Sequence, residues 1–230
     1  YDTLLQDGKI SQGPGTHMLG QHFSKPFNIT YLDNNGKKEY VWQTSWGLST
    51  RQLGILIMHH GDDKGAVLPP EVSPIQVVIV PILFKNKEKI VTDKANEVND
   101  KLEGMGIRTY FDDRDYSPGF KFNEWELRGV PLRIEIGPKD IENKEVTVVR
   151  RPDGKKSKLD IKKLPDVLSM LASIQSEMLE KSRKFLKDNI RDAKNLVELK
   201  NVSKNGGIIR ANWCGSDKCE KGLKFETEGA

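Results

Sequence analysis

The segment Thr44–Arg51 reads Thr-Ser-Trp-Gly-Leu-Ser-Thr-Arg and combines residue types that can bind an anion. Its pattern predicts the end of a polar β-strand followed by an apolar helix, with Arg51 at the helix start. An arginine there can place its planar fork of donors on an anion, beside the unpaired N–H groups of the helix. Gly47 lets a ligand approach the backbone closely, and Trp46 can cover a small apolar ring. The segment is a candidate phosphate clamp; the alternative is a structural arginine paired with a carboxylate.

A second candidate is the glycine-rich segment Gln12–His17, with the sequence Gln-Gly-Pro-Gly-Thr-His. It is neither a Walker loop nor a dinucleotide fingerprint, and a simple turn is the alternative interpretation. No serine or cysteine nucleophile pairs with His17 in the sequence pattern. Positioning and charge neutralisation are therefore favoured over covalent or acid–base catalysis.

A third region combines charged side chains with aromatic rings. The loop 112–116 and the strand that carries Arg133 and Glu135, followed by Lys139 and Asp140, lie near the aromatic residues Tyr116, Phe120, Phe122 and Trp125. Unpaired RNA bases are recognised by such a mixture, through stacking and hydrogen bonds to base edges. A mixed salt-bridge surface is the competing explanation.

The two cysteines form a Cys-x4-Cys pair, Cys214 and Cys219. This spacing is compatible with half of a zinc site, but two thiolates cannot complete a tetrahedron. Two free or buried thiols are the alternative.

The first sixty residues predict a hairpin and a helix. Segments 27–32 and 40–44 flank the turn Asp33-Asn-Asn-Gly36, whose residues tolerate positive φ. The helix 48–60 is apolar nearly all round, so we expect it to be buried against a sheet. Leu68–Pro74, which contains three prolines, indicates a linker.

The middle of the chain predicts a βαβαβ order with a closing hairpin. The continuous β-branched run 75–82 is typical of a strand covered on both faces, and in the strand 131–137 apolar and charged residues alternate. The remaining elements are a helix from Val91 to Met105, strand 107–111, a helix from Pro118 to Gly129, and hairpin strands 145–150 and 156–161. This order predicts a small, mostly parallel sheet with helices on it.

The last part predicts one long helix from about Asp166 to Lys200, broken by Gly206-Gly207. Its expected buried stripe is Val167, Leu168, Leu171, Ile174, Met178, Phe185 and Leu186. Between Arg150 and Lys204 there are 15 Lys and Arg against 8 Asp and Glu, although the whole chain carries only +4. A basic half suits a phosphate backbone; a solvated helix face is the alternative.

Composition places the chain among globular proteins, with 230 residues, 36% hydrophobic and 30% charged. No stretch approaches the roughly 18 apolar residues of a membrane span, and the first residues do not form a signal peptide. Two cysteines are too few for a disulfide framework, which favours a reducing cytoplasm. Both ends look cut, so we expect a piece of a longer protein.

Four blocks of sequence are similar to a known family. They are Gln12…His17-Met-Leu-Gly-Gln21, Ser45–Arg51, His60-Gly-Asp…Gly65…Leu68-Pro-Pro70 and Gly119…Gly129-Val-Pro-Leu-Arg-Ile-Glu-Ile-Gly137. With Trp213-Cys-Gly215…Cys219-Glu220 they span nearly the whole chain. On these residues the chain resembles the C-terminal part of a prolyl-tRNA synthetase of the archaeal/eukaryotic type.

The resemblance implies a multidomain α/β and α+β chain. Residues 1–70 would be the rear of the antiparallel catalytic sheet of a class II synthetase, including its third signature motif. Residues 74–172 would be a mixed, mostly parallel, five-stranded anticodon-binding domain. Residues 173–230 would be a truncated, small α/β C-terminal domain.

The resemblance also assigns roles to single residues. Arg51 would be the catalytic arginine on the ATP triphosphate, and the other ATP-binding residues would be Gln12, Gly15, Thr16 and Ser49. The proline pocket would be lined by His17, Ser45, Trp46 and Gly47. The tRNA anticodon would be read by Arg133, Glu135, Lys139 and Asp140. Cys214 and Cys219 would match the first half of a four-cysteine zinc site.

Two departures from the family pattern matter. The family usually has Gly-Thr-Ser-His where this chain has Pro14-Gly15-Thr16-His17, so Gly15 occupies a position where a threonine contacts nucleotide. The first two class II motifs and the second cysteine pair are absent from the chain.

The implied activity is ligation of proline to its tRNA, with ATP and Mg²⁺, in a parent protein of which this piece is not expected to be active alone. The implied partners are tRNA-Pro, L-proline, ATP and a second copy in a homodimer, in the cytoplasm and without a membrane. The alternative function is a non-catalytic RNA-binding or regulatory paralogue.

Overall fold

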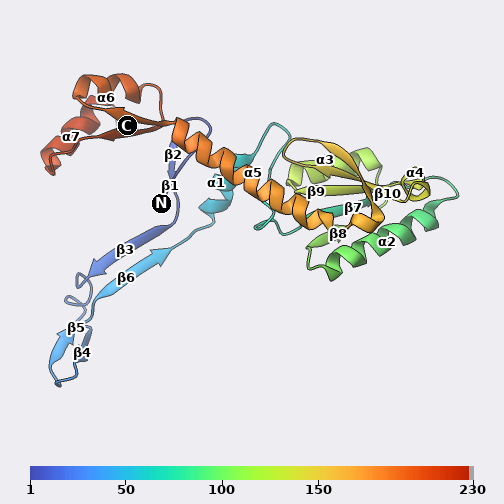
Figure 1. Ribbon diagram of the computed structural model, residues 1–230. Helices are drawn as coiled ribbons and strands as arrows, with labels where there is room; N and C mark the ends of the chain where they lie inside the picture. Colours follow the sequence, from blue (N-terminus) through green and yellow to red (C-terminus); the bar gives the residue numbers. More distant parts are fainter. Residues whose placement is uncertain (228–230) are drawn as a thin grey trace. The chain divides into compact units, whose positions relative to one another are not determined.

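The structure, a computed structural model, describes residues 1–227 and divides into two compact units. One unit is His60–Asn189; the other is Tyr1–His59 together with the chain from Ile190 onward (Figure 1). No helix among the described residues is long and apolar enough to cross a membrane.

The unit His60–Asn189 is built on a five-stranded sheet with the order β11-β10-β9-β7-β8. Strand β7 is parallel to both of its neighbours, whereas β10 pairs antiparallel with β9 and with β11. The strands are β7 (Val77–Pro81), β8 (Thr109–Phe111), β9 (Leu132–Ile136), β10 (Glu145–Arg150) and β11 (Lys156–Asp160). The predicted order of strands and helices, with its closing hairpin, is confirmed.

Helices cover this sheet on both faces. Helices α2 (Glu88–Gly104) and α5 (Asp166–Asp188) contribute to one buried cluster, and α3 (Pro118–Arg128) contributes to the other. Val77 and Ile79 belong to the first cluster, and Val78 and Val80 to the second. The apolar run of β7 is thus explained, because every one of its side chains is buried. Two short elements complete the unit, α4 (Pro138–Glu142) and the 3-10 turn η1 (Ile161–Lys163).

Helix α3 begins and ends where its sequence predicts. The Ser117 hydroxyl accepts the N–H of Phe120 before Pro118 opens the helix. Gly129 closes it in the left-handed conformation, with φ of 76°. A Cβ at Gly129 would lie 2.5 Å from the Ala66 carbonyl oxygen, so glycine is required there for space as well as for conformation.

The prediction of one helix from Asp166 to Lys200 is wrong in its second half. Helix α5 ends at Asp188, and β12 (Ile190–Ala193) and α6 (Leu196–Ser203) follow. Asn189 donates to the Phe185 carbonyl at the helix end, and Asn195 caps α6, so polar side chains bound the non-helical segment. Strand β12 pairs in parallel with β13 (Ile208–Ala211), and this pairing supplies backbone hydrogen bonds that a continued helix would otherwise have supplied.

The expected stripe of α5 is buried only in its first four turns. Val167, Leu171, Ile174 and Met178 are buried, as predicted. Leu168 and Leu186 are instead 47% and 41% exposed. Leu168 lies beside Val167 on the helix and faces away from the sheet, and Leu186 lies in the last turn, past the buried part.

The first sixty residues form pairs of short strands and one helix. Strand β3 (Gly15–Gly20) pairs antiparallel with β6 (Gln43–Gly47), and β1 (Asp2–Leu4) with β2 (Ile10–Gln12). A hairpin does form around the predicted turn, from β4 (Thr30–Leu32) and β5 (Lys38–Tyr40). The predicted second strand 40–44 is wrong, because it overlaps β5 only at Tyr40 and its end belongs to β6, which pairs with β3. Helix α1 (Arg51–His60) follows, and α7 (Asp217–Glu226) ends the described chain.

The expectation that α1 is buried against a sheet is not met in this structure. Ile55 is its single buried residue, whereas Leu53 is 65% and Ile57 50% exposed. The described strands of this unit form only two-stranded sheets, which cannot cover a helix that is apolar on every side. The His59 imidazole contacts the Leu4 carbonyl, so one side of α1 lies on the β1 segment.

The segment 68–74, predicted to be a linker, is instead packed onto the unit His60–Asn189. Pro69 and Pro70 are buried. The Arg108 guanidinium donates to the carbonyls of Ser73 and Pro70, at 3.0 and 2.9 Å. Proline-rich sequence indicated the absence of helix correctly, but it could not reveal the arginine that holds the segment.

Candidate functional site

One face of the five-stranded sheet is polar where α3 does not cover it. Alternation places Leu132, Ile134 and Ile136 in the buried cluster and turns Arg133 and Glu135 to the opposite face. Thr147 lies directly opposite Glu135 and Lys158, so these side chains share that face. We call this set the polar sheet face: Arg133, Glu135, Thr147, Lys156 and Lys158.

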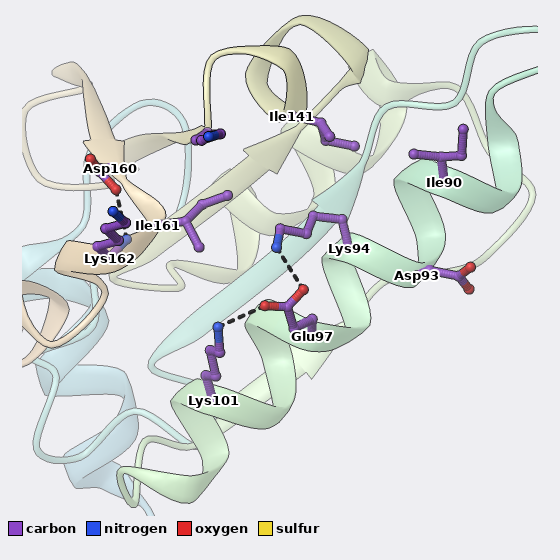
Figure 2. Close-up of a pocket in the computed structure, with 10 residues that line it drawn as sticks. Ile90, Asp93, Lys94, Glu97, Lys101, Ile141, Asp160, Ile161 and Lys162 are labelled. Atoms are coloured by element: carbon purple, nitrogen blue, oxygen red, sulfur yellow. Dashed lines mark hydrogen bonds and ion pairs between the residues drawn. The ribbon is translucent and has the colours of Figure 1, made fainter.

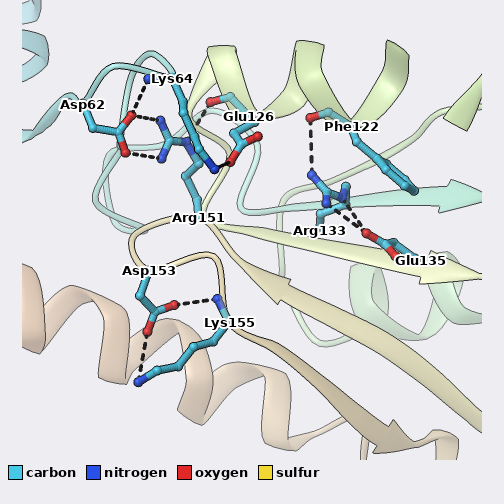
Figure 3. A network of polar contacts seen from close by, with 9 residues as sticks. All are labelled: Asp62, Lys64, Phe122, Glu126, Arg133, Glu135, Arg151, Asp153 and Lys155. Carbon is cyan, nitrogen blue, oxygen red and sulfur yellow. Dashed lines mark hydrogen bonds and ion pairs between the residues drawn. The ribbon is translucent and has the colours of Figure 1, made fainter. Parts of the chain in front are cut away.

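Arg133 and Glu135 are paired with each other (Figure 3). Nε and Nη2 of Arg133 donate to Oε1 of Glu135, at 3.0 and 2.9 Å, and Nη1 donates to the Phe122 carbonyl. The guanidinium lies 4.2 Å from the centre of the Phe122 ring, and Lys156 Nζ lies 3.6 Å from Glu135. A base edge that binds either side chain must therefore replace or share these contacts.

The carboxylate of Asp140 is already engaged. Its Oδ2 accepts the Gly137 N–H at 2.8 Å, which closes the N-terminus of α4. Its Oδ1 accepts the Thr147 hydroxyl and Lys158 Nζ, at 3.1 and 2.6 Å. The hydrogen bond to Asp140 raises the pKa of Lys158. In this structure Asp140 holds α4 against the polar sheet face.

Lys139 differs from the other three predicted anticodon residues. It is exposed at the first turn of α4, and no carboxylate lies within ion-pair distance of it in the described part of the chain. Its ammonium group is therefore free to meet a phosphate or a base edge.

A buried carboxylate that sequence reasoning missed organises the loop before α3. The Asp112 side chain is fully buried and accepts the Trp125 indole N–H at 2.7 Å. Arg114 donates two hydrogen bonds to it, both of 2.9 Å, and buried Lys121 lies 3.8 Å away. Burial acts to raise the pKa of Asp112, but the hydrogen bonds from Arg114 and Trp125 outweigh it and lower the pKa to about 2.

No local pattern indicates this network, because its donors Arg114, Lys121 and Trp125 lie up to thirteen residues away from Asp112. Aspartate in a loop is ordinary; a fully buried aspartate is not. The burial of the loop could be recognised only from the packing of α3 on the sheet.

A second missed ion pair ties the start of the unit to its sheet (Figure 3). Arg151 donates to both carboxylate oxygens of Asp62, at 2.7 and 2.6 Å, and its Nε donates to the Glu126 carbonyl at the end of α3. The hydrogen bond from Arg151 lowers the pKa of Asp62 to about 2. Lys64 adds a pair with Glu126 at 2.9 Å.

A pocket of about 570 Å³ lies beside α2 and is also lined by residues of α4 and of the segment at the end of β11 (Figure 2). Apolar Ile90, Ile141 and Ile161 line it together with charged residues. Glu97 bridges Lys94 and Lys101 there, at 2.6 and 2.7 Å, so much of the charge is already paired. None of the residues predicted to bind ATP, proline or tRNA lines this pocket.

The β3–β6 pair brings several predicted nucleotide and proline residues together. Gly15 lies opposite Gly47, Thr16 opposite Trp46, and His17 opposite Ser45. Because neighbouring residues of a strand face opposite sides, Gly15, His17, Ser45 and Gly47 share one face, and Thr16 and Trp46 share the other. The strands thus divide the predicted proline-binding residues between two faces.

His17 lies over Gly15 on the first of these faces. A Cβ at Gly15 would lie 3.0 Å from Nε2 of His17, so a side chain larger than glycine would push the imidazole away. The glycine therefore allows the present position of the ring. Trp46, on the second face, is 82% exposed.

The remaining predicted ATP residues are placed less closely. Arg51 is the first residue of α1, and its side chain is exposed and makes no ion pair within residues 1–227. Ser49 precedes it and accepts the Gln52 N–H through its carbonyl, which starts the helix. Gln12 lies on β2, paired with Asp2, outside the β3–β6 ladder.

Cys214 lies just before α7, and Cys219 lies in the first turn of that helix. The pKa of Cys214 is lowered, mainly by a hydrogen bond from the Ser216 backbone N–H and further by a hydrogen bond with the Cys219 thiol. Such a pair can supply two thiolate ligands. The described residues contain no group of three or more His, Cys, Asp or Glu that could hold a metal. The donor set for a zinc or magnesium site is therefore incomplete within them.

Comparison with known proteins agrees with this geometry. Residues 76–171, which include the five-stranded sheet, match the family described as "Anticodon binding domain". The chain is 43% identical to a proline–tRNA ligase of Natranaerobius thermophilus over 99% of the chain and 47% of that protein. It is 43% identical to the proline–tRNA ligase of Cenarchaeum symbiosum, over 98% of the chain and 48% of that protein.

A third relative is proline–tRNA ligase 2 of Clostridioides difficile, with 44% identity over 98% of the chain and 47% of that protein. The chain spans about half the length of the curated relatives that it matches. These relatives do not confirm the narrower archaeal/eukaryotic type. Residues 76–171 therefore match an anticodon-binding domain, and nearly the whole chain is similar to about half of each of these proline–tRNA ligases.

Proposed function

We propose that the chain serves as part of a proline–tRNA ligase that activates proline with ATP and transfers it to tRNA-Pro. The observation that carries this proposal is the identity of 43% over 99% of the chain, together with an anticodon-binding domain. Homodimerisation and a cytoplasmic location stay predictions from the resemblance.

In the proposed first step, a carboxylate oxygen of proline attacks the α-phosphorus of ATP. The bond from that phosphorus to the leaving oxygen breaks, and pyrophosphate departs. Arg51, at the positive end of α1, would neutralise charge on the triphosphate. Magnesium, when bound, adds further neutralisation of phosphate charge. In the second step a hydroxyl at the tRNA 3′ end attacks the prolyl carbonyl, and AMP leaves.

For the β3–β6 strands we propose positioning rather than acid–base chemistry. His17 and Ser45 lie opposite each other on one face, where a small amino acid could be held by hydrogen bonds. Trp46 on the other face offers an apolar wall. The two faces cannot line one enclosed pocket through strand side chains alone, so the proposed proline pocket uses primarily the His17 face.

For the unit His60–Asn189 we propose that the polar sheet face and α4 contact the anticodon, through Arg133, Glu135, Lys139 and Asp140. Lys139 is the residue best placed for direct contact, because it is exposed and unpaired within residues 1–227. Asp140 acts through α4, whose N-terminus it closes. Arg133 and Glu135 would open their mutual pair to read a base.

The proposal predicts salt-dependent tRNA binding by the chain. The logarithm of the binding constant for a tRNA-Pro transcript should fall linearly with the logarithm of the salt concentration. Lys139→Gln should reduce the magnitude of that slope by about one. Lys187→Gln, in the last turn of α5 and outside the matched domain, is the matched control and should leave the slope unchanged. Filter binding over a range of KCl concentrations measures it. Binding that is independent of salt, or no binding at low salt, would contradict the proposal.

A further inference from the structure

Two aromatic rings stand exposed beside each other where β8 leads into α3. Tyr116, in the loop, and Phe120, in the first turn of α3, are 54% and 51% exposed. Their ring centres are 4.7 Å apart, with an angle of 40° between the planes. Of the other aromatic residues of this region, Trp125 is buried and Phe122 lies under the Arg133 guanidinium.

Neighbouring side chains hold the Tyr116–Phe120 pair in place. The Arg114 guanidinium lies 5.5 Å from the centre of the Tyr116 ring. Arg114 is itself fixed by two hydrogen bonds to buried Asp112 and by one of 2.7 Å to Glu124. Phe120 is fixed by the start of α3, since its N–H is accepted by the Ser117 cap. The rings are therefore largely ordered before any ligand arrives, which lowers the entropic cost of binding.

The surrounding charges distinguish a base from a phosphate. Asp113 and Asp115 are exposed on either side of Arg114, and neither makes an ion pair within residues 1–227. Two carboxylates repel a phosphate, but they accept hydrogen bonds from the amino and imino groups of a base edge. The arginine meanwhile strengthens stacking through its positive charge.

The position within the fold supports the same ligand. Strands β7, β8 and β9 run parallel, so their carboxyl ends lie at one edge of the sheet. The loop that carries Tyr116 follows β8, and α4 with Lys139 follows β9, at this same edge. Both lie inside the region that matches the anticodon-binding domain.

We propose that Tyr116 and Phe120 form a stacking platform for one unpaired base of the bound tRNA, with Asp113 and Asp115 as acceptors for its edge. This inference rests on the proposed function, because it names the chemical group that the domain binds and the rings that bind it. Stacking on an aromatic ring tolerates every base, so the platform would contribute affinity and the carboxylates preference.

The test uses the full chain and an RNA hairpin with the anticodon stem and loop of tRNA-Pro, carrying 2-aminopurine in turn at each loop position. Tyr116→Leu and Phe120→Leu remove the rings but keep apolar bulk. Each should weaken binding of the hairpin by about 5-fold to 100-fold, the range for loss of one stacked base. At one loop position the 2-aminopurine fluorescence should be quenched by the wild-type chain and recover in the variants.

Three controls separate the possible results. Tyr116→Phe keeps the ring and should bind normally, and Phe225→Leu removes an exposed ring outside the matched domain and should also bind normally. A duplex RNA without unpaired bases should bind all variants equally. Thermal melting by circular dichroism should be unchanged, because both rings of the platform are more than half exposed.

Two negative results have different meanings. If the wild type binds the hairpin but a chain with both Tyr116→Leu and Phe120→Leu binds it equally well, with the same quenching, the platform is refuted and the proposed function stands. The same result is expected if the two rings bind a protein and not a base. If the wild type binds the hairpin no better than the duplex, the proposed function fails and the platform with it.

Discussion

Asp112→Ala is expected to destabilise the unit His60–Asn189 by about 3–5 kcal/mol, the range for removing one partner of a buried charged network. The substitution leaves Lys121, which is 2% exposed, without its carboxylate, and leaves the Trp125 indole N–H without an acceptor. Arg114 loses both of its hydrogen bonds to the carboxylate. Urea unfolding followed by tryptophan fluorescence measures the loss.

The neighbouring Asp113→Ala is the matched control. Asp113 is exposed, so its removal should change the free energy of unfolding by no more than about 0.5 kcal/mol. Equal unfolding midpoints for the two variants would contradict the role given to Asp112.

The same network predicts the direction of a pH effect. The pKa of Asp112 is about 2 in the folded chain, below the value of about 3.9 for an unperturbed aspartate. Its contribution is therefore fully present above about pH 4 and is lost as the pH falls towards 2. Asp112→Asn should remove this part of the acid dependence, while that from Asp62, whose pKa is also about 2, should remain.

Arg51→Ala is expected to lower ATP–pyrophosphate exchange by about 10²-fold to 10³-fold, the cost of removing one donor that stabilises developing charge. Because the chain spans about half the length of its relatives, the assay belongs in a full-length ligase that contains this sequence. The exposed guanidinium at the start of α1 makes no competing ion pair within residues 1–227, so the loss should fall on nucleotide chemistry and not on folding.

Two further variants sharpen this prediction. Arg51→Lys keeps the charge but not the planar fork, and should recover only part of the activity. Lys9→Ala, an exposed change in the same unit, should leave exchange unchanged. Near-normal exchange in Arg51→Ala would contradict the assignment. Absence of exchange in the unsubstituted ligase would favour the non-catalytic paralogue.

Much of the sheet could be predicted from local sequence, because local pattern and final environment agree there. The apolar run of β7 is buried on both faces, and the alternation in β9 separates buried Ile134 from polar Arg133. Ser117, Pro118 and Gly129 act at the ends of α3 through local backbone geometry. These signals depend on neighbours within a few residues.

The errors arise where distant partners decide the outcome. The predicted helix to Lys200 failed because β12 gains its partners from β13, eighteen residues later. The apolar helix α1 was expected to be buried, but the described strands do not cover it. Arg108, which holds the segment 68–74, and Arg151, which holds Asp62, act across 35 or more residues.

In the candidate site, too, the local sequence predicted the kind of residue but not the distant partners of each side chain. Residue types near the polar sheet face indicated nucleic-acid recognition, and residues 76–171 match an anticodon-binding domain. The sequence could not separate residues that are engaged, such as Asp140, from one that is exposed, such as Lys139, because the partners Thr147 and Lys158 come from other strands. The individual site residues therefore stay predictions.

The proposed function requires that this chain recognise tRNA-Pro through its anticodon. The most direct test is competition binding between tRNA-Pro and the same tRNA with all three anticodon bases replaced, at one fixed salt concentration. We expect the altered tRNA to bind about 10-fold or more weakly, since each lost base contact costs about 1–3 kcal/mol. Equal affinity for the two tRNAs would contradict it.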